Sequence, residues 1–190
     1  MTYLAVDLAE EGFTLRSGGA NGSDRAFELG CVQAHGRMEI YLPWKKFNKN
    51  ISPLFSVSDE AMQLASTVHP AWNKCSDAAK KLHGRNCYQV LGRYLNNPSD
   101  FVVCYTEGGE IKGGTATAIN LALRHNVPVF NLGSMNIEEV RKQIWNTLER
   151  LQINVADKQY YEEGIGINYD DVDPTDDDPT NGSWDELRPY

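Results

Sequence analysis

Blocks of hydrophobic and polar residues alternate along the chain and predict helices and strands in turn. Apolar residues at helical spacing predict helices at 3–11, 23–33, 59–68, 77–95, 113–125 and 137–151. Short apolar runs between them predict strands at 13–16, 39–42, 101–105 and 127–132. The run 101–105 is apolar throughout, as is typical of a strand buried on both faces. This alternation predicts an α/β fold, a doubly wound parallel sheet with helices on both faces.

Local signals refine several of these helices. Ser58 or Asp59 can cap the helix that ends near Val68, and His83-Gly84 marks a candidate break in the helix that follows. The side chains available for the inner face of helix 23–33 are Ala26, Leu29, Cys31 and Val32. The closing helix carries its apolar residues at helical spacing, at Ile137, Val140, Ile144 and Leu148.

The acidic excess of the chain is confined to its last residues. The chain has 190 residues and a formal net charge of −8. Residues 1–158 hold 17 Lys and Arg against 16 Asp and Glu, whereas residues 159–190 hold one Arg against ten acidic residues. We therefore expect one nearly neutral domain at 1–158 and an acidic, disordered tail at 159–190.

The cysteines and histidines show no pattern of a metal site or a disulfide framework. The four cysteines are scattered without a Cys-x-x-Cys pair, and His69, His83 and His125 are dispersed along the sequence. No apolar stretch has the length of a membrane span, and residues 1–15 show no secretory signal. These features predict a reduced, cytoplasmic protein with no metal, no cofactor and no membrane partner.

Two glycine-rich turns stand between a predicted strand and the helix after it. The first comprises Ser17, Gly18, Gly19, Ala20, Asn21 and Gly22 and is followed by Asp24, and the second ends with Gly113, Gly114 and Thr115. Such turns lie at the carboxyl ends of parallel strands, where glycine lets backbone amides approach a phosphate and the next helix presents its positive end. Neither turn matches the dinucleotide fingerprint or the P-loop. Together they predict a phosphate site, with tight loop geometry as the alternative.

Polar side chains of a third stretch lie between the two turns. Arg85, Asn86 and Gln89 offer one forked cation and two amides, and a helix would place Arg85 and Gln89 on the same face. Arg85 can neutralise a phosphate through two hydrogen bonds. The alternative is a structural arginine that binds carbonyl groups or pairs at the surface. For Asp24 the alternatives are a structural role at the start of a helix and a contact to a ribose hydroxyl.

In this order, the three stretches resemble the SLOG superfamily, which includes the DprA/Smf DNA-processing proteins and the LOG phosphoribohydrolases. The first turn with Asp24 is similar to the SGxAxGxD phosphate-binding stretch of DprA proteins, Arg85-Asn86 resembles their RN pair, and Gly113-Gly114-Thr115 resembles the GGT loop of the superfamily. The resemblance covers about residues 15–132 and is closest to small DprA-like proteins of phages and bacteria. It implies a Rossmann-like fold, a nucleotide ligand and a homodimer, for which the helix 137–151 is the candidate interface.

Two features depart from the pattern of the superfamily. Its first strand ends in a turn that carries Gly and Ser-Arg, whereas this chain begins in the predicted helix 3–11, so the usual first strand is missing or lies upstream of Met1. LOG enzymes carry a glutamate three residues after the GGxGT threonine, where it acts on the glycosidic bond. Here that position is Ala118, so general acid–base help at the sugar is lost unless a carboxylate at Asp24, Glu28, Glu107 or Glu110 substitutes, and the resemblance leaves catalysis undecided.

The leading prediction is a module that binds a nucleotide or a nucleotide-derived molecule in order to sense, sequester or process it. The alternative is a DprA-like protein that binds single-stranded DNA. Its candidate basic residues are Lys45, Lys46, Lys49, Lys74, Lys80 and Lys81. A nearly neutral domain argues against strong non-specific DNA binding, and Ala118 disfavours a third reading as a nucleoside-monophosphate phosphoribohydrolase.

Overall fold

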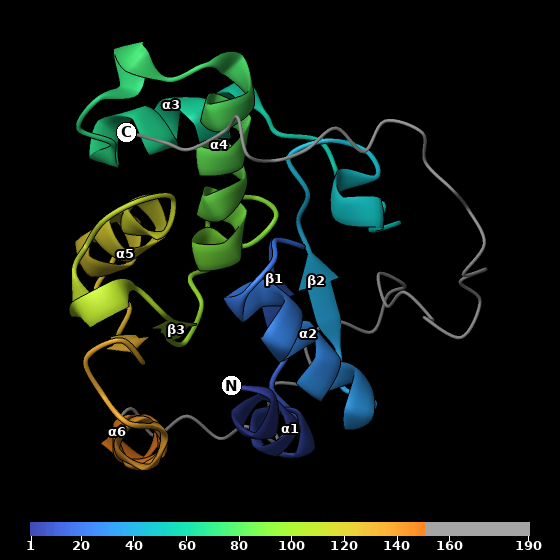
Figure 1. Ribbon diagram of the computed structural model, residues 1–190, viewed down its shortest axis with the longest axis vertical. Helices are drawn as coiled ribbons and strands as arrows, with labels where there is room; N and C mark the ends of the chain where they lie inside the picture. Colours follow the sequence, from blue (N-terminus) through green and yellow to red (C-terminus); the bar gives the residue numbers. More distant parts are fainter. Residues whose placement is uncertain (151–190) are drawn as a thin grey trace.

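The computed structural model describes residues 1–150, in which helices alternate with short strands (Figure 1). The helices are α1 (Thr2–Glu10), α2 (Ser23–Gln33), α3 (Asp59–Val68), α4 (Asp77–Leu91), α5 (Thr115–Arg124) and α6 (Ile137–Arg150). The strands are β1 (Leu15–Ser17), β2 (Met38–Ile40), β3 (Val102–Cys104) and β4 (Val129–Asn131). Every predicted element is present, with ends that differ by a few residues. The predicted acidic tail at 159–190 lies outside the described residues.

The strands form two parallel pairs. β1 pairs with β2 and β3 pairs with β4, and each pair is connected through one helix, α2 or α5. These two βαβ units confirm the α/β class. The ladders do not join the pairs into one sheet within residues 1–150, so the single doubly wound sheet stays a prediction.

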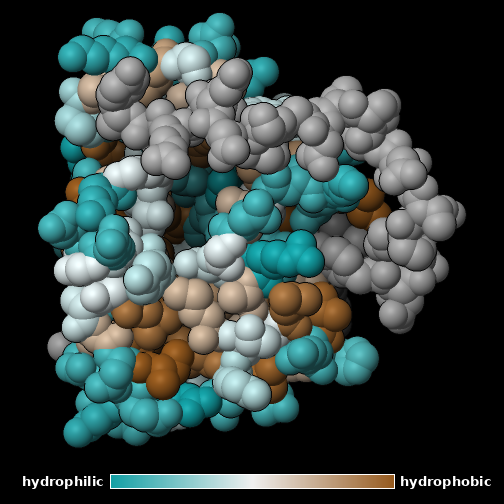
Figure 2. All heavy atoms as spheres, viewed as in Figure 1, coloured by the Kyte–Doolittle hydropathy of each residue, from teal (hydrophilic) through white to brown (hydrophobic). Residues whose placement is uncertain are grey.

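Helices pack on both faces of the strands. Val102 of β3 and Val129 of β4 contact a core cluster built by α3, α4 and α5. On the other face, Val103 and Phe130 belong to a cluster with α1 and α6. Adjacent residues of each strand therefore point into different cores, as alternation along a strand requires. Figure 2 shows hydrophobic residues gathered on this side of the molecule, between the strands and helices α1 and α6.

A cavity of about 650 Å³ lies between the two strand pairs. It is lined by Leu15–Ser17 on one side and by residues 97–101 and Val103 on the other. Leu15 and Ser17 are bonded to β2, so the parallel ladder turns the amide and carbonyl of Arg16 toward the cavity. On the other side of the cavity, Val102 and Cys104 are hydrogen-bonded to the β4 side, so the amide and carbonyl of Val103 in β3 point toward the cavity.

Helix α4 is continuous through His83-Gly84, so the candidate break at this pair is wrong. Its first turn is capped by Ser76, whose hydroxyl accepts a hydrogen bond from the amide of Ala79 at 3.2 Å. A Cβ on Gly84 would lie 2.7 Å from Cγ1 of Val57, so glycine allows the segment before α3 to approach closely. The helix ends at Leu91, because the next residue, Gly92, has a φ of 71°. The predicted continuation to residue 95 is therefore wrong.

The buried face of α2 differs from the predicted one. Phe27, Gly30 and Cys31 are buried, whereas Leu29 and Val32 are 49% and 42% exposed. The reason is the close approach of α1: a Cβ on Gly30 would lie 2.3 Å from the carbonyl oxygen of Thr2. The apolar content of the helix alone could not show that its small residue faces the neighbouring helix.

Helix α6 uses its apolar stripe inside the chain. Val140, Ile144 and Leu148 are buried in the cluster that includes α1. A homodimer through α6 would therefore have to use its other face, where Trp145 is 37% exposed, and it stays a prediction. Among the helices of residues 1–150, none has both the length and the apolar composition to cross a bilayer.

Candidate functional site

A second cavity, of about 1040 Å³, lies where the two glycine-rich turns approach α4. Three parts of the chain form its polar wall. The first turn contributes Asn21, Gly22 and Asp24, α4 contributes Arg85, Asn86 and Gln89, and the second turn contributes Gly114 and Thr115. The cavity therefore gathers residues that are far apart in the sequence, as the resemblance implied.

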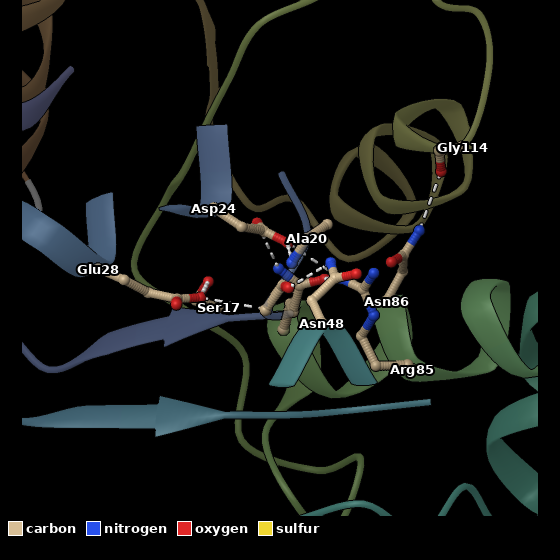
Figure 3. A network of polar contacts seen from close by, with 10 residues as sticks. Ser17, Ala20, Asp24, Glu28, Asn48, Arg85, Asn86 and Gly114 are labelled. Atoms are coloured by element: carbon tan, nitrogen blue, oxygen red, sulfur yellow. Dashed lines mark hydrogen bonds and ion pairs between the residues drawn. The ribbon is translucent and has the colours of Figure 1, made fainter. Parts of the chain in front are cut away.

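Two carboxylates of α2 hold the first turn in place (Figure 3). The amide of Gly19 donates to Oε1 of Glu28 at 3.1 Å, and the Ser17 hydroxyl donates to the same oxygen at 2.5 Å. The amide of Ala20 donates to Oδ2 of Asp24 at 3.1 Å. The amides of Gly19 and Ala20 are thus already bonded within the protein, and their contact with a phosphate stays a prediction.

Glu28, which the sequence offered only as a candidate acid–base group, is absent from the predicted phosphate-binding set but holds the first turn. The pKa of Glu28 is raised, and burial is the largest cause. The charge of Asp24 raises it further, while the hydrogen bonds from Ser17 and Gly19 and the charge of Arg85 lower it. A partly buried carboxyl thus lies beneath the first turn, tied to its backbone. Its signal in the sequence was its place one turn after Asp24 on α2, which keeps both carboxylates near the start of the helix.

Gly18 lies directly against the guanidinium of Arg85. A Cβ at residue 18 would be 1.5 Å from Nη1 of Arg85, so only glycine permits this contact. The backbone on the other side of the turn is held by Asn48, whose Nδ2 donates to the Gly19 carbonyl at 2.9 Å. Glycine is needed at this position for the approach of a side chain, where the sequence indicated the approach of a phosphate.

Arg85 is a buried cation whose donors are only partly used. It is 6% exposed, and its Nη1 donates to Oε1 of Gln89 at 2.5 Å and to Oδ2 of Asp24 at 3.3 Å. Its Nε has no hydrogen-bond partner among the described residues. Burial lowers the pKa of Arg85, and the charges of Asp24 and Glu28 oppose this. Arg85 therefore pairs with a carboxylate, as the structural alternative allowed, but in a buried position and not at the surface.

Asn86 connects α4 to the second turn. Its Nδ2 donates to the carbonyl of Gly114 at 2.9 Å, immediately before α5 (Figure 3). Because Asp24 accepts from Arg85 and Gln89 at distances of 3.3 Å and 3.4 Å, one helix holds both turns. The relative position of the turns is set by these side chains.

Helices α2 and α5 begin at the cavity without a side-chain cap. Their N-cap residues are Gly22 and Gly114, and neither provides a capping group. By contrast, Ser58 caps α3 and Ser76 caps α4. Within residues 1–150, the first amides of α2 and α5, those of Ser23 and Thr115, have no hydrogen-bond acceptor. Two positive helix ends with free donors therefore face one cavity.

The remaining residues of the predicted site differ in how deeply they are buried. Ser17, Gly18 and Gly19 are buried beneath the first turn, and Gly113 is exposed at the surface; none of these four lines the cavity. Ala118, which stands at the position of the LOG glutamate, lines the cavity. Asp24 is the one carboxylate among the described residues that line it, and this carboxylate is paired with Arg85.

Three further cavity residues were missed because they are separated in the sequence. His69 follows α3, Cys75 precedes α4, and His83 lies within α4, yet all three line the cavity together. The rings of His69 and His83 have centroids 4.3 Å apart, so the fold brings together two histidines that are distant in the sequence, while His125 lies outside this cluster. Burial, together with the charges of His69 and Arg85, lowers the pKa of His83 to about 4, and the imidazole is uncharged at neutral pH.

Comparison with known proteins adds no family to this description: no family model, curated protein or solved structure matches the chain. The SLOG resemblance therefore rests on the quoted motifs alone, and the site is interpreted from its own geometry.

Proposed function

We propose that the protein binds a phosphate-bearing nucleotide in the larger cavity, with the phosphate at the start of α2 or α5. The observation that supports this best is the pair of uncapped helix ends on either side of a buried arginine. Free amides and a positive helix end are the usual receptors of a phosphate. A cavity of about 1040 Å³ also has room for the base and the sugar.

The charge of the cavity wall favours an anion. Among the described residues that line the cavity, Lys74 and Arg85 are positively charged and Asp24 is the one carboxylate. The cavity wall therefore carries a net charge of +1 from these residues. Arg85 is already oriented by Gln89 and Asp24, and its ordering entropy has been lost before the ligand arrives. A phosphate that approaches can share this guanidinium with Asp24.

The proposal includes a Rossmann-like arrangement of the strands. Both pairs are parallel, each encloses a crossover helix, and helices lie on both faces. Both turns of the site follow strands, β1 and β3, at the carboxyl ends where α/β folds bind ligands. This arrangement supports the resemblance to the SLOG superfamily.

The experiment is a thermal shift with AMP, ADP-ribose, NAD and a cyclic nucleotide, with adenosine as the ligand that lacks phosphate. We expect at least one phosphate-bearing member to raise the melting temperature and adenosine to have no effect. Gly114→Asp should weaken binding at least tenfold, since a carboxylate at the start of α5 occupies the place of the phosphate. There is space for the new side chain because no atom lies within 4 Å of a Cβ on Gly114.

The control places the same charge at a helix start outside the cavity. Asn136 accepts a hydrogen bond from the amide of Glu139 before α6, and Asn136→Asp keeps this cap. The control should bind the nucleotide like the wild-type protein. A panel in which no nucleotide shifts the melting temperature contradicts the proposal. Equal binding by Gly114→Asp and wild type excludes the start of α5 and leaves the start of α2 as the phosphate position.

A further inference from the structure

Two histidines and a cysteine converge at the edge of the larger cavity. His69, Cys75 and His83 each offer one ligand atom, and these three atoms lie within 4.8 Å of one another. Sγ of Cys75 is 3.8 Å from both ring nitrogens of His69. They come from three separate segments, the end of α3, the turn before α4 and α4 itself. Their convergence is therefore produced by the fold.

Their spacing is close to that of a tetrahedral metal site. Zn–S and Zn–N bonds of about 2.3 and 2.0 Å place sulfur and nitrogen ligands about 3.5 Å apart around one ion. The 3.8 Å between Cys75 and His69 is a few tenths of an ångström longer than this. All three ligand atoms lie within 4.8 Å of one another, so binding one ion requires side-chain rotations that draw them closer. Imidazole and thiolate are also the ligands that Zn²⁺ prefers.

The orientation of His83 is fixed by a hydrogen bond at one ring nitrogen, which leaves the other nitrogen for a metal ion, as in metal-binding histidines. Its Nδ1 is 2.8 Å from the hydroxyl oxygen of Thr117 on α5, and both residues are buried. With Nδ1–H donating to this hydroxyl, Nε2 carries the lone pair and is the ligand atom. The hydrogen bond also ties α5 to the cluster.

We propose that His69, Cys75 and His83 bind one Zn²⁺ or a chemically similar divalent transition-metal ion, with the fourth coordination position open to the cavity. All three residues line that cavity, so water or a ligand atom can complete the coordination. Three protein ligands with one open position are the arrangement found in catalytic zinc sites. The proposal does not rest on nucleotide binding.

Binding requires two local changes. The thiol of Cys75 gives up its proton to solvent and becomes the thiolate ligand. The amide of Ala71 donates to Nδ1 of His69 at 3.2 Å, and this bond is lost when His69 binds the ion through Nε2, because Nδ1 must then carry the proton. Ala71 is exposed, so water can accept from its amide in place of the ring.

The test is a Co²⁺ titration of the chelator-treated full chain, followed by absorption. We expect one ion per chain, visible bands typical of tetrahedral cobalt, a thiolate charge-transfer band in the near ultraviolet, and loss of all bands on addition of Zn²⁺. Cys75→Ser should abolish the charge-transfer band, and His69→Gln should weaken binding at least tenfold. His125→Gln, a change at an exposed histidine outside the cluster, should leave the titration unchanged.

A second measurement covers the case in which a variant does not fold. Cys75 is half-buried, whereas Cys31, Cys87 and Cys104 are buried, so alkylation of the native protein should modify Cys75 first. Zn²⁺ should slow this modification at least tenfold. The proposal is overturned if no cobalt bands appear, if they persist unchanged in Cys75→Ser, or if Zn²⁺ leaves the alkylation rate of Cys75 unchanged.

Discussion

At the scale of single residues, the site depends on the absence of a side chain at Gly18. The guanidinium of Arg85 occupies the space in which a Cβ at residue 18 would lie. Burial of this cation is tolerated because Gln89 and Asp24 accept from it. A larger residue at position 18 would therefore displace the guanidinium of Arg85, rather than primarily distort the backbone of the turn.

We expect Gly18→Ala to lower the free energy of unfolding by about 3 kcal/mol, because it displaces Arg85 from its acceptors in a packed region. Gly113→Ala is the matched control: its φ is 65° but no atom lies within 4 Å, so only the left-handed backbone contributes, at about 1 kcal/mol. Urea unfolding measures both. In an Arg85→Ala background the cost of Gly18→Ala should mostly disappear; an undiminished cost there would show that Arg85 is not the cause.

The residues of the site were predictable where a motif names them. Gly114, Arg85 and Asn86 lie at the cavity as the motifs indicated. Glu28 could not be assigned to the turn, since its role depends on which face of α2 meets Ser17 and Gly19. The cluster around His69 was equally out of reach, because contact between the end of α3 and the middle of α4 is a property of the tertiary fold.

At the scale of elements, α4 gains contacts at the cost of helix propensity. Gly84 lies in its interior, where glycine is about 1 kcal/mol less favourable than alanine. A Cβ there would lie 2.7 Å from Val57 and 3.1 Å from Cγ of Met62. Close packing of this segment therefore opposes the local preference of the helix.

We expect Gly84→Ala to destabilise the protein by about 1 kcal/mol, since overpacking costs about 1–3 kcal/mol and exceeds the gain in propensity. Removing the obstacle should reverse the sign: in a Val57→Ala background, Gly84→Ala should stabilise the protein. Thermal and urea unfolding of the four variants form the cycle. A stabilising effect of Gly84→Ala alone would contradict this expectation. It would mean that the segment 50–57 moves away from the added methyl group at little cost.

The elements themselves followed from periodicity, and their limits from local chemistry. Ser58 caps α3 as predicted, because capping depends on residues adjacent in the sequence. The buried face of α2 and the continuity of α4 did not follow, since both depend on close contacts at Gly30 and Gly84. Glycine inside a helix was ambiguous until its neighbours were known.

At the scale of the whole molecule, the distribution of charge disfavours the proposal of a single-stranded DNA ligand. The basic residues proposed for DNA are divided: Lys74 lines the cavity, Lys80 is 3.9 Å from Asp77, and residues 45–49 form a separate segment. Residues 1–158 carry a balance of only +1. A continuous basic track, which single-stranded DNA requires, is not evident from these positions.

We expect labelled oligo-dT to bind with a Kd no lower than about 10⁻⁶ M near physiological salt, the range of non-specific binding. Fluorescence anisotropy at several salt concentrations measures this, with excess AMP as competitor. Much tighter binding that weakens steeply with salt would favour the DprA-like alternative. Competition by AMP would then place the DNA in the nucleotide cavity.

The two strand pairs face each other across a cavity, and each pair carries one of the glycine-rich turns. Within residues 1–150 no backbone ladder joins them. Side chains of α4 bond to both sides of the cavity, and Arg16 of β1 donates to the carbonyl of Asn97 before β3. A ligand that contacts the starts of both α2 and α5 would connect the two strand pairs. We expect such a ligand to make the middle of the molecule stiffer, and this added stiffness to be lost when the ligand leaves.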